Sequence, residues 1–240
     1  MKNMVEIKHF KMIFGDKAVI KDLSFEVKKG EIFGLLGANG SGKTTTIRAL
    51  LNLYTPTAGE LLIDGKKYNP ENSKITVGYL PEERGLYRKE TVIDTMMYFG
   101  ELKGLENPRE WSEKFLARVN LLDKINEKVE KLSGGQQQKI QLGITIMNNP
   151  KLLILDEPTK GFDPMNRRLL MGIIDELHQK GTSIIMITHY MDEVERLCDR
   201  ALLLKDGTAR AYGTINEIKK EFKGKSLDQI FVDIYGENYE

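Results

Sequence analysis

The chain is 240 residues long, which is enough for one substantial core, and 40% of its residues are hydrophobic while 30% are charged. Its 36 basic and 35 acidic residues leave a net charge of +1, so no global field draws it to DNA or RNA and a nucleic-acid partner is not expected. The one cysteine, Cys198, cannot form an internal disulfide, which fits a reducing cytoplasm; its helical spacing with Val194 favours core packing over redox chemistry.

The apolar segments of the chain are short. The N-terminus lacks the long apolar stretch of a signal peptide. The strongest apolar runs, at residues 152–155 and 184–187, have the length of strands and fall far below the ~20 residues of a membrane span. We therefore expect no membrane crossing, and any role at a membrane would come through a partner.

Two antiparallel strands are predicted near the N-terminus, at residues 5–7 and 23–27, because both alternate apolar and polar side chains with period two. The Lys29-Gly30 pair then turns the chain into a third, mostly apolar strand at residues 31–36. The first two segments predict an N-terminal antiparallel β-subdomain.

The third strand runs directly into a complete phosphate-binding loop, G-x-x-x-x-G-K-T. Its glycines let successive backbone N–H groups turn inward into a nest for phosphate oxygens. Lys43 would add a positive charge at the β- and γ-phosphates, and Thr44 a hydroxyl for Mg²⁺. A helix with Ile47 and Leu50 on one face follows, so its N-terminus points at the anion. The predicted nucleotide-binding residues of this segment are Gly37, Asn39, Gly40, Ser41, Gly42, Lys43, Thr44 and Thr45.

Residues 59–67, with an Asp64-Gly65 turn, predict a further hairpin element. From about residue 91 to 149 the pattern becomes helical, which predicts an inserted helical subdomain. Near-continuous apolar strands are predicted at residues 151–156 and 182–188, as in a parallel sheet that is covered on both faces. A helix at residues 166–179 connects these two strands, and a small amphipathic helix is expected from Leu227 to Ile234.

The sequence Ser133-Gly134-Gly135-Gln136 lies within the helical region. Ser-x-x-Gln is a capping-box arrangement, so Ser133 is predicted to cap a helix through Ile140. The two glycines would let the backbone approach a phosphate closely, and the helix dipole would favour the γ-phosphate there. The same four residues also fit an ordinary capped helix after a flexible turn.

The apolar strand at residues 152–155 ends in Asp156 and Glu157. A buried strand delivers its last residues to the sheet edge where open α/β sheets bind ligands. Asp156 is predicted to hold the Mg²⁺ shell and Glu157 to act as general base on the attacking water; an acidic cap on the next turn is the alternative. His189 follows the strand that ends at Thr188, where a ring nitrogen could bond the γ-phosphate, although a lone histidine is more often structural.

Taken in chain order, these motifs resemble the ATPase subunit of an ATP-binding-cassette (ABC) transporter along nearly the whole sequence. The family order is aromatic residue, phosphate loop, glutamine loop, signature, Asp-Glu strand, Asp loop and switch histidine. The resemblance implies that Phe14 stacks on adenine, with core filling as the alternative, and that the signature is 133–136. It places the Asp loop at residues 159–163, with Phe162 where Leu is more usual.

The implied fold class is α/β: a P-loop NTPase core with a mainly parallel sheet, the N-terminal antiparallel β-subdomain and the inserted helical subdomain. We expect a single ABC ATPase domain over residues 1–240. Within it, the helical insertion would cover about 91–149 and a small C-terminal helical extension about 215–240.

The sequence departs from the family pattern at the glutamine loop, residues 78–87. Glu82 stands where most members place Gln, which adds a negative charge beside the Mg²⁺. The resemblance gives this loop a metal contact, so Glu82 joins Thr44 and Asp156 as a predicted metal residue. The segment Pro-Glu-Glu-Arg-Gly-Leu-Tyr and the later Ser-Leu-x-x-Ile-Phe segment are similar in sequence to the ATPase subunits of bacterial sodium- and drug-efflux exporters.

In that family the phosphate loop of one copy faces the signature of a second copy, and two ATP molecules lie between them. Because this chain carries both halves, a two-fold homodimer would be self-complementary, and loss of the γ-phosphate would open it. The resemblance therefore implies an ATP- and Mg²⁺-dependent ATPase that powers an exporter. It would sit at the cytoplasmic face of the cell membrane on a membrane-spanning permease, docked near residues 79–87.

A soluble single-cassette ATPase that acts as an assembly factor, as in iron–sulfur cluster biogenesis, is the main alternative. Family members that act on ribosomes usually carry two cassettes, and this chain has room for one. Chromosome-maintenance relatives insert a long coiled coil between phosphate loop and signature, whereas fewer than a hundred residues separate them here. A small-molecule kinase would leave the signature unexplained.

Overall fold

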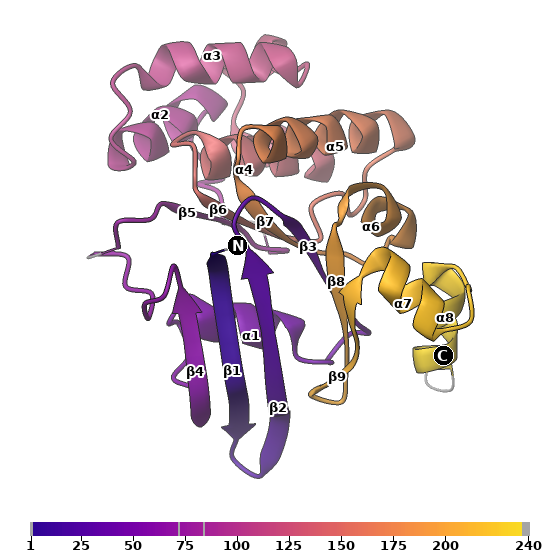
Figure 1. The fold of residues 1–240 in the computed structure, drawn as a ribbon. Helices are drawn as coiled ribbons and strands as arrows, with labels where there is room; N and C mark the ends of the chain where they lie inside the picture. Colours follow the sequence, from indigo (N-terminus) through magenta and orange to yellow (C-terminus); the bar gives the residue numbers. More distant parts are fainter. Residues whose placement is uncertain (1, 72, 84, 237–240) are drawn as a thin grey trace. The chain divides into compact units, whose positions relative to one another are not determined.

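The computed structural model describes residues 2–71, 73–83 and 85–236. The chain forms two compact units, of which the first comprises Met1–Ile75 with Leu177–Glu240 and the second Thr76–Glu176. Helix α5 (Pro164–Gln179) carries the chain from the second unit back into the first (Figure 1).

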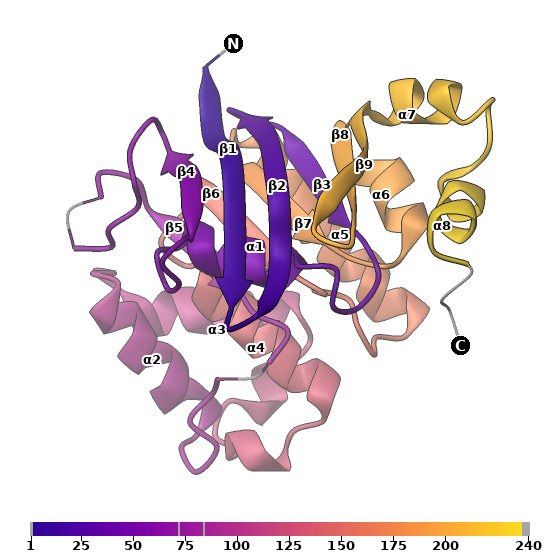
Figure 2. The same cartoon turned by 90° about the horizontal axis from the view of Figure 1, so that it is seen from below.

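Three antiparallel strands form the N-terminal part of the first unit: β1 (Asn3–Phe14), β2 (Lys17–Lys28) and β4 (Ala58–Ile63). Strand β1 lies between the other two, because Val5 pairs with Val27 of β2 and with Ile63 of β4 (Figures 1 and 2). The predicted antiparallel strands are therefore confirmed. The hairpin expected at residues 59–67 is wrong in its second half, since only an isolated bridge joins Ile63 to Lys66 and β4 pairs with β1 instead. The apolar alternation stops at the Asp64-Gly65 turn, so no second strand has a face to bury.

The rest of the first unit is largely parallel. Its remaining strands are β3 (Ile32–Leu36), β7 (Ser183–Ile187), β8 (Arg200–Lys205) and β9 (Thr208–Thr214). Strand β3 pairs in parallel with both β7 and β8, and every residue of β3 and β7 is buried, as expected for strands covered on both faces. The strand order within this unit is β4-β1-β2-β9-β8-β3-β7. Its helices are α1 (Lys43–Leu50), α6 (Met191–Leu197), α7 (Ile215–Glu221) and α8 (Leu227–Tyr235).

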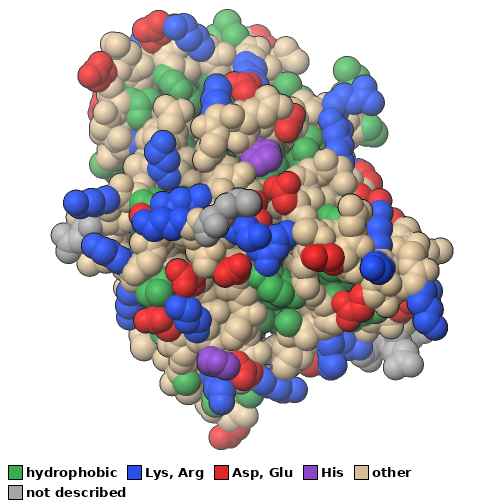
Figure 3. Space-filling model, in the orientation of Figure 1, with side chains coloured by type: hydrophobic (Ala, Val, Ile, Leu, Met, Phe, Trp, Pro, Cys, Tyr) green, Lys and Arg blue, Asp and Glu red, His purple; other side chains and the backbone are tan. Residues whose placement is uncertain are grey.

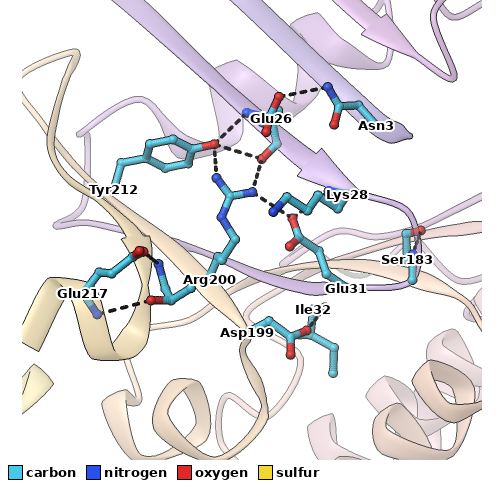
Figure 4. A network of polar contacts seen from close by, with 12 residues as sticks. Asn3, Glu26, Lys28, Glu31, Ile32, Ser183, Asp199, Arg200, Tyr212 and Glu217 are labelled. Atoms are coloured by element: carbon cyan, nitrogen blue, oxygen red, sulfur yellow. Dashed lines mark hydrogen bonds and ion pairs between the residues drawn. The ribbon is translucent and has the colours of Figure 1, made fainter. Parts of the chain in front are cut away.

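A polar network fixes the start of β3 (Figure 4). The guanidinium of Arg200 donates to the backbone oxygen of Glu26 at 3.3 Å and to the carboxylate of Glu31 at 3.4 Å, and it lies 4.7 Å from the ring centre of Tyr212. The Glu31 carboxylate also accepts the N–H of Lys28 at 2.7 Å. Burial raises the pKa of Glu31 above its ordinary value, and these donors compensate its charge in part. The network therefore anchors the residue that precedes the strand leading into the phosphate loop.

The second unit combines two parallel strands with a group of helices. Its elements are β5 (Val77–Leu80), β6 (Leu152–Asp156), α2 (Val92–Leu102), α3 (Pro108–Arg118), the short 3-10 helices η1 (Leu122–Lys124) and η2 (Val129–Lys131), and α4 (Gly134–Ile146). Leu80 of β5 pairs with Leu155 of β6. The helices expected from about residue 91 to 149 are present, and α3 contacts α4 where the ring of Phe115 covers Gly143.

Two surface properties bear on possible partners. Basic and acidic side chains are both present on the face drawn in Figure 3, in keeping with the net charge of +1. Within the described ranges, none of the helices combines the length and apolar composition that a membrane crossing would need.

Candidate active site

The phosphate-binding loop connects β3 to α1, as the motif predicts. Its glycines at both ends are required by their surroundings. Gly37 has φ of 158°, and a Cβ there would lie 2.5 Å from the carbonyl oxygen of Leu204. Gly42 has φ of 110°, and its Cβ would lie 2.4 Å from the Cδ1 of Ile20. The loop is thus packed between β8 and β2 so closely that a side chain at either glycine would collide with them.

The loop holds a buried ammonium group. Lys43 is only 9% exposed, and its Nζ donates to the carbonyl oxygens of Gly37 at 2.8 Å and Ala38 at 3.0 Å. The Oγ of Ser41 is buried as well and has no hydrogen-bond partner among the described residues. Buried polar groups are rarely left unsatisfied, so this hydroxyl fits a ligand that brings its own acceptor or donor. The loop therefore fits the oxygens of a nucleotide phosphate.

The beginning of helix α1 adds backbone donors to the loop. Gly42 is its N-cap residue, and no side chain caps the helix. The first N–H groups of any α-helix have no acceptor within the helix itself, which is the arrangement that favours an anion at a helix N-terminus. Thr44 and Thr45 are half-buried in this first turn, while Asn39 and Gly40 are exposed at the tip of the loop.

Phe14, the last residue of β1, is 46% exposed. Its ring meets that of Tyr54 edge-on, with 5.5 Å between centroids, and Arg48 donates to the Tyr54 hydroxyl at 3.1 Å. The exposure argues against core filling and leaves ring surface available for stacking. Stacking on adenine stays a prediction.

His189 lies at the same edge of the first unit as the phosphate loop. Strands β3 and β7 run in parallel, with Gly34 opposite Met186, so the residues that follow both strands leave at one end. Thr188, just before the histidine, is buried and accepts the N–H of Tyr190 at 3.1 Å. His189 itself is exposed, and its ring lies 4.3 Å from that of Tyr190. The expected approach to a γ-phosphate is compatible with this position.

The second unit carries the predicted carboxylates. Asp156 is the last residue of β6 and is 2% exposed. Glu157 follows with φ of 52°, a left-handed backbone that costs an ordinary residue about 1–2 kcal/mol. The carbonyl oxygen of Glu157 accepts the N–H of Lys160 at 3.2 Å, which closes a turn directly after the strand. This turn sets the direction in which the chain leaves the strand, and the catalytic role of Glu157 stays a prediction.

Metal binding by protein groups alone is not indicated. Across residues 2–71, 73–83 and 85–236, no group of three or more His, Cys, Asp or Glu side chains is placed to hold a metal ion. Mg²⁺ typically binds through one or two protein oxygens, together with phosphates and water. Thr44 in the first unit and Asp156 in the second each carry an oxygen of the kind that Mg²⁺ prefers, and their metal role stays a prediction.

The predicted cap at Ser133 is confirmed. Its Oγ accepts the N–H of Gln136 at 3.3 Å, and its own N–H donates to the Gln136 side chain at 2.8 Å, which completes a capping box at the start of α4. Gly134 and Gly135 form the first turn. A Cβ on Gly135 would lie 3.1 Å from the ring of Phe162, so the glycine lets the Asp-loop residue pack against this turn.

Glu82 forms an ion pair that the sequence did not reveal. The Nζ of Lys160 donates to its Oε1 at 2.6 Å, with both side chains about half exposed. Leu80 pairs with Leu155, so Glu82 and Glu157 leave adjacent strands at the same edge. A cation that bound Glu82 would have to compete with Lys160 for the carboxylate. The opposite charges of the two residues were visible in the sequence, but their separation of 78 residues hid the contact.

Comparison with known proteins places these features in a family. A family model described as "ABC transporter" matches residues 20–160, more than half of the chain. An uncharacterized ABC transporter ATP-binding protein from Methanocaldococcus jannaschii is 44% identical over 220 residues, which cover 91% of this chain and 80% of that protein. A Nod factor export ATP-binding protein I from Rhizobium sp. (strain N33) is 36% identical over 234 residues, or 96% and 77% of the two chains.

A solved structure is similar along almost the whole fold. It is described as the ATP-binding subunit of an ABC transporter, with a TM-score of 0.88 and 30% sequence identity. The match covers 96% of this chain and 98% of that one.

Proposed function

The chain belongs to the ABC transporter family as one of its ATPases, and we propose that it powers an exporter by binding and hydrolysing ATP between two copies of itself. The observation that carries this proposal is the phosphate loop, which holds the buried Lys43 ammonium and the unpartnered Ser41 hydroxyl and which leaves no room for a side chain at Gly37 or Gly42.

On binding, the triphosphate would accept hydrogen bonds from the backbone N–H groups at the start of α1. Its negative charge would also draw the Lys43 ammonium group away from the carbonyl oxygens of Gly37 and Ala38. Phe14 would stack on the adenine. Mg²⁺, when bound, would neutralise phosphate charge, and Thr44 with Asp156 would hold it. Each of these groups positions the nucleotide before any bond changes.

For hydrolysis, Glu157 would accept a proton from the water that attacks the γ-phosphorus. His189 would donate a hydrogen bond to an oxygen of the same γ-phosphate and so keep the phosphorus aligned with the attacking water. A general base typically contributes 10²–10⁴-fold to the rate. Replacing Glu157 should therefore remove turnover while leaving binding intact.

A second copy would complete each site. The first turn of α4 at residues 133–136 is partly exposed, and its backbone N–H groups and dipole suit a phosphate held by the partner's loop. One chain carries both the loop and the signature turn, so a two-fold pair makes two equivalent sites. Hydrolysis would remove the bridging γ-phosphate and let the pair open.

The membrane partner would be a permease that docks on an aromatic cluster of the second unit. Tyr87 and Tyr98 are 51% and 46% exposed, and both contact Phe99, with ring centroids 5.8 and 5.5 Å away respectively. Leu102, at the end of the same helix α2, is 66% exposed. Exposed aromatic clusters of this kind commonly mark interfaces, and this one lies beside the loop that contains Glu82.

We place the chain at the cytoplasmic face of the membrane through its permease, and two observations support export as the direction of transport. One is the printed name of the Nod factor export relative. The other is the sequence of the segment around Glu82, which resembles that of efflux exporter ATPases. A soluble assembly factor would share the nucleotide chemistry but would have no permease to dock.

Cross-linking separates these two possibilities. Tyr87→Cys should cross-link to a membrane protein in native membranes, whereas the control Leu122→Cys, which is also exposed and in the same unit, should not. The native Cys198 does not interfere, because burial raises the pKa of its thiol and hides it from reagents. Equal labelling of both variants, with an active protein in the soluble fraction, would favour the assembly factor.

A further inference from the structure

The ion pair between Glu82 and Lys160 joins the segment after β5 to the segment after β6. Both residues belong to the second unit, and the 2.6 Å contact links positions that are 78 residues apart. Leu80 and Leu155 are paired neighbours, so Glu82 and Glu157 follow them by the same two residues. The pair therefore sits at the strand ends that carry the predicted catalytic carboxylates.

Glu82 and Glu157 follow paired residues of adjacent strands, and Asp156 is the last residue of the second of these strands. Adjacent strands lie about 4.8 Å apart, well inside the ~8 Å over which charges interact at physiological salt. A positive charge at this edge lowers the repulsion between these carboxylates. The ammonium group of Lys160 contributes one such charge, in direct contact with the carboxylate of Glu82.

The same lysine belongs to the turn that carries Glu157. Its N–H donates to the Glu157 carbonyl oxygen at 3.2 Å, and the left-handed φ of 52° at Glu157 sets the direction of the chain there. Two residues later, Phe162 packs on the first turn of α4 over Gly135. The segment that follows Glu157 is thus held at two points, by the ion pair of Lys160 and by the ring contact of Phe162.

We propose that Lys160 is a positioning residue for ATP hydrolysis: its ion pair with Glu82 holds the turn that presents Glu157 to the attacking water. This inference rests on the proposed role of Glu157 as general base. An exposed ion pair contributes modestly, which corresponds to about a 1.5- to 5-fold effect on the rate. The effect falls on kcat, because the lysine acts through Glu157 and does not bind the nucleotide.

Steady-state ATPase kinetics of Lys160→Gln, Glu82→Gln and the double variant test this at about 0.05 and 0.5 M salt. Each single variant should lose 1.5- to 5-fold in kcat at low salt with KM for ATP within about twofold, and the double variant should lose no more than either. High salt should shrink the difference from wild type, because screening weakens the ion pair in the wild-type protein. Lys160→Arg should retain the wild-type rate.

The control is Lys151→Gln, an exposed lysine in the same unit just before β6 that should leave kcat unchanged. Thermal melting accompanies each measurement. Additive losses in the double variant, an arginine variant as slow as the glutamine one, or melting temperatures that fall in step with kcat would each overturn the inference. If wild type hydrolyses no more ATP than Lys43→Ala, the proposed function fails and this inference with it. Normal hydrolysis with an unaffected Lys160→Gln overturns the inference alone.

Discussion

The packing of Gly143 against Phe115 allows a test in which the same substitution at two glycines should affect stability differently. A Cβ on Gly143 in α4 would lie 2.5 and 2.7 Å from two ring atoms of Phe115, which is itself buried. Gly172 in α5 is exposed, and a Cβ there meets nothing within 4 Å outside its own helix. Both changes to alanine add the same methyl group to a helix.

The expected difference in the free energy of unfolding follows from one contribution that both variants share and one that only Gly143→Ala has. Glycine to alanine inside a helix stabilises by about 1 kcal/mol in both cases. Overpacking at Gly143 costs a further 1–3 kcal/mol or so, and Gly172 has no such cost. The helix contribution cancels in the comparison, so Gly143→Ala should be less stable than Gly172→Ala by about 1–3 kcal/mol. At roughly 2–4 °C per kcal/mol for a chain of this size, the melting temperatures should differ by about 2–12 °C.

Thermal unfolding followed by circular dichroism measures this difference. Gly172→Ala should melt slightly above wild type and Gly143→Ala below Gly172→Ala. Phe115→Leu provides the second check, because it should cost less in the Gly143→Ala background than in wild type if the ring is the colliding group. Equal melting temperatures for the two glycine variants would refute the reasoning that Gly143 sets how closely α4, which carries the signature turn, packs on α3.

Other predictions address the site directly. Lys43→Ala should weaken ATP binding by about 10- to 150-fold in equilibrium titration, as expected for one lost hydrogen bond of a charged group; unchanged affinity would contradict the phosphate-loop assignment. Gly37→Ala should cost about 1–3 kcal/mol or more of stability in chemical denaturation, because its Cβ meets a backbone oxygen at 2.5 Å. Ser133→Ala should lower stability by about 1 kcal/mol through loss of the cap, and an unshifted midpoint would count against the capping box. Glu82→Gln should leave the Mg²⁺ midpoint of ATPase activity unchanged, because Lys160 engages the carboxylate; a shifted midpoint would identify Glu82 as a metal ligand.

Local sequence was sufficient where the physics is local. The phosphate loop is contiguous, and its glycine and lysine roles follow from backbone conformation and charge within eight residues. The capping box at Ser133 likewise joins residues three positions apart and was confirmed. The buried strands around residues 152–155 and 184–187 were recognisable because a strand covered on both faces is almost uniformly apolar.

Contacts between distant residues were not accessible in this way. The pairs Arg200–Glu31 and Glu82–Lys160 join residues that are 169 and 78 positions apart, and no periodic pattern in the sequence predicts either contact. The β8–β9 hairpin was also missed. Its turn is Asp206-Gly207, a recognisable signal, but β9 carries polar and small residues whose alternation is weak. The second half of the hairpin expected at residues 59–67 was wrong for the opposite reason. The Asp64-Gly65 turn is an equally good turn signal, but no strand follows it.

The central claim is that γ-phosphate joins two copies of this chain and that Glu157 ends that state by hydrolysis. Static light scattering of Glu157→Gln with and without MgATP, alongside its turnover, tests it most directly. The expected result is an ATP-dependent dimer, with ATP binding retained and the rate reduced by about 10²–10⁴-fold. A protein that stays monomeric with ATP while hydrolysing it at the wild-type rate would contradict both the bridge and the base.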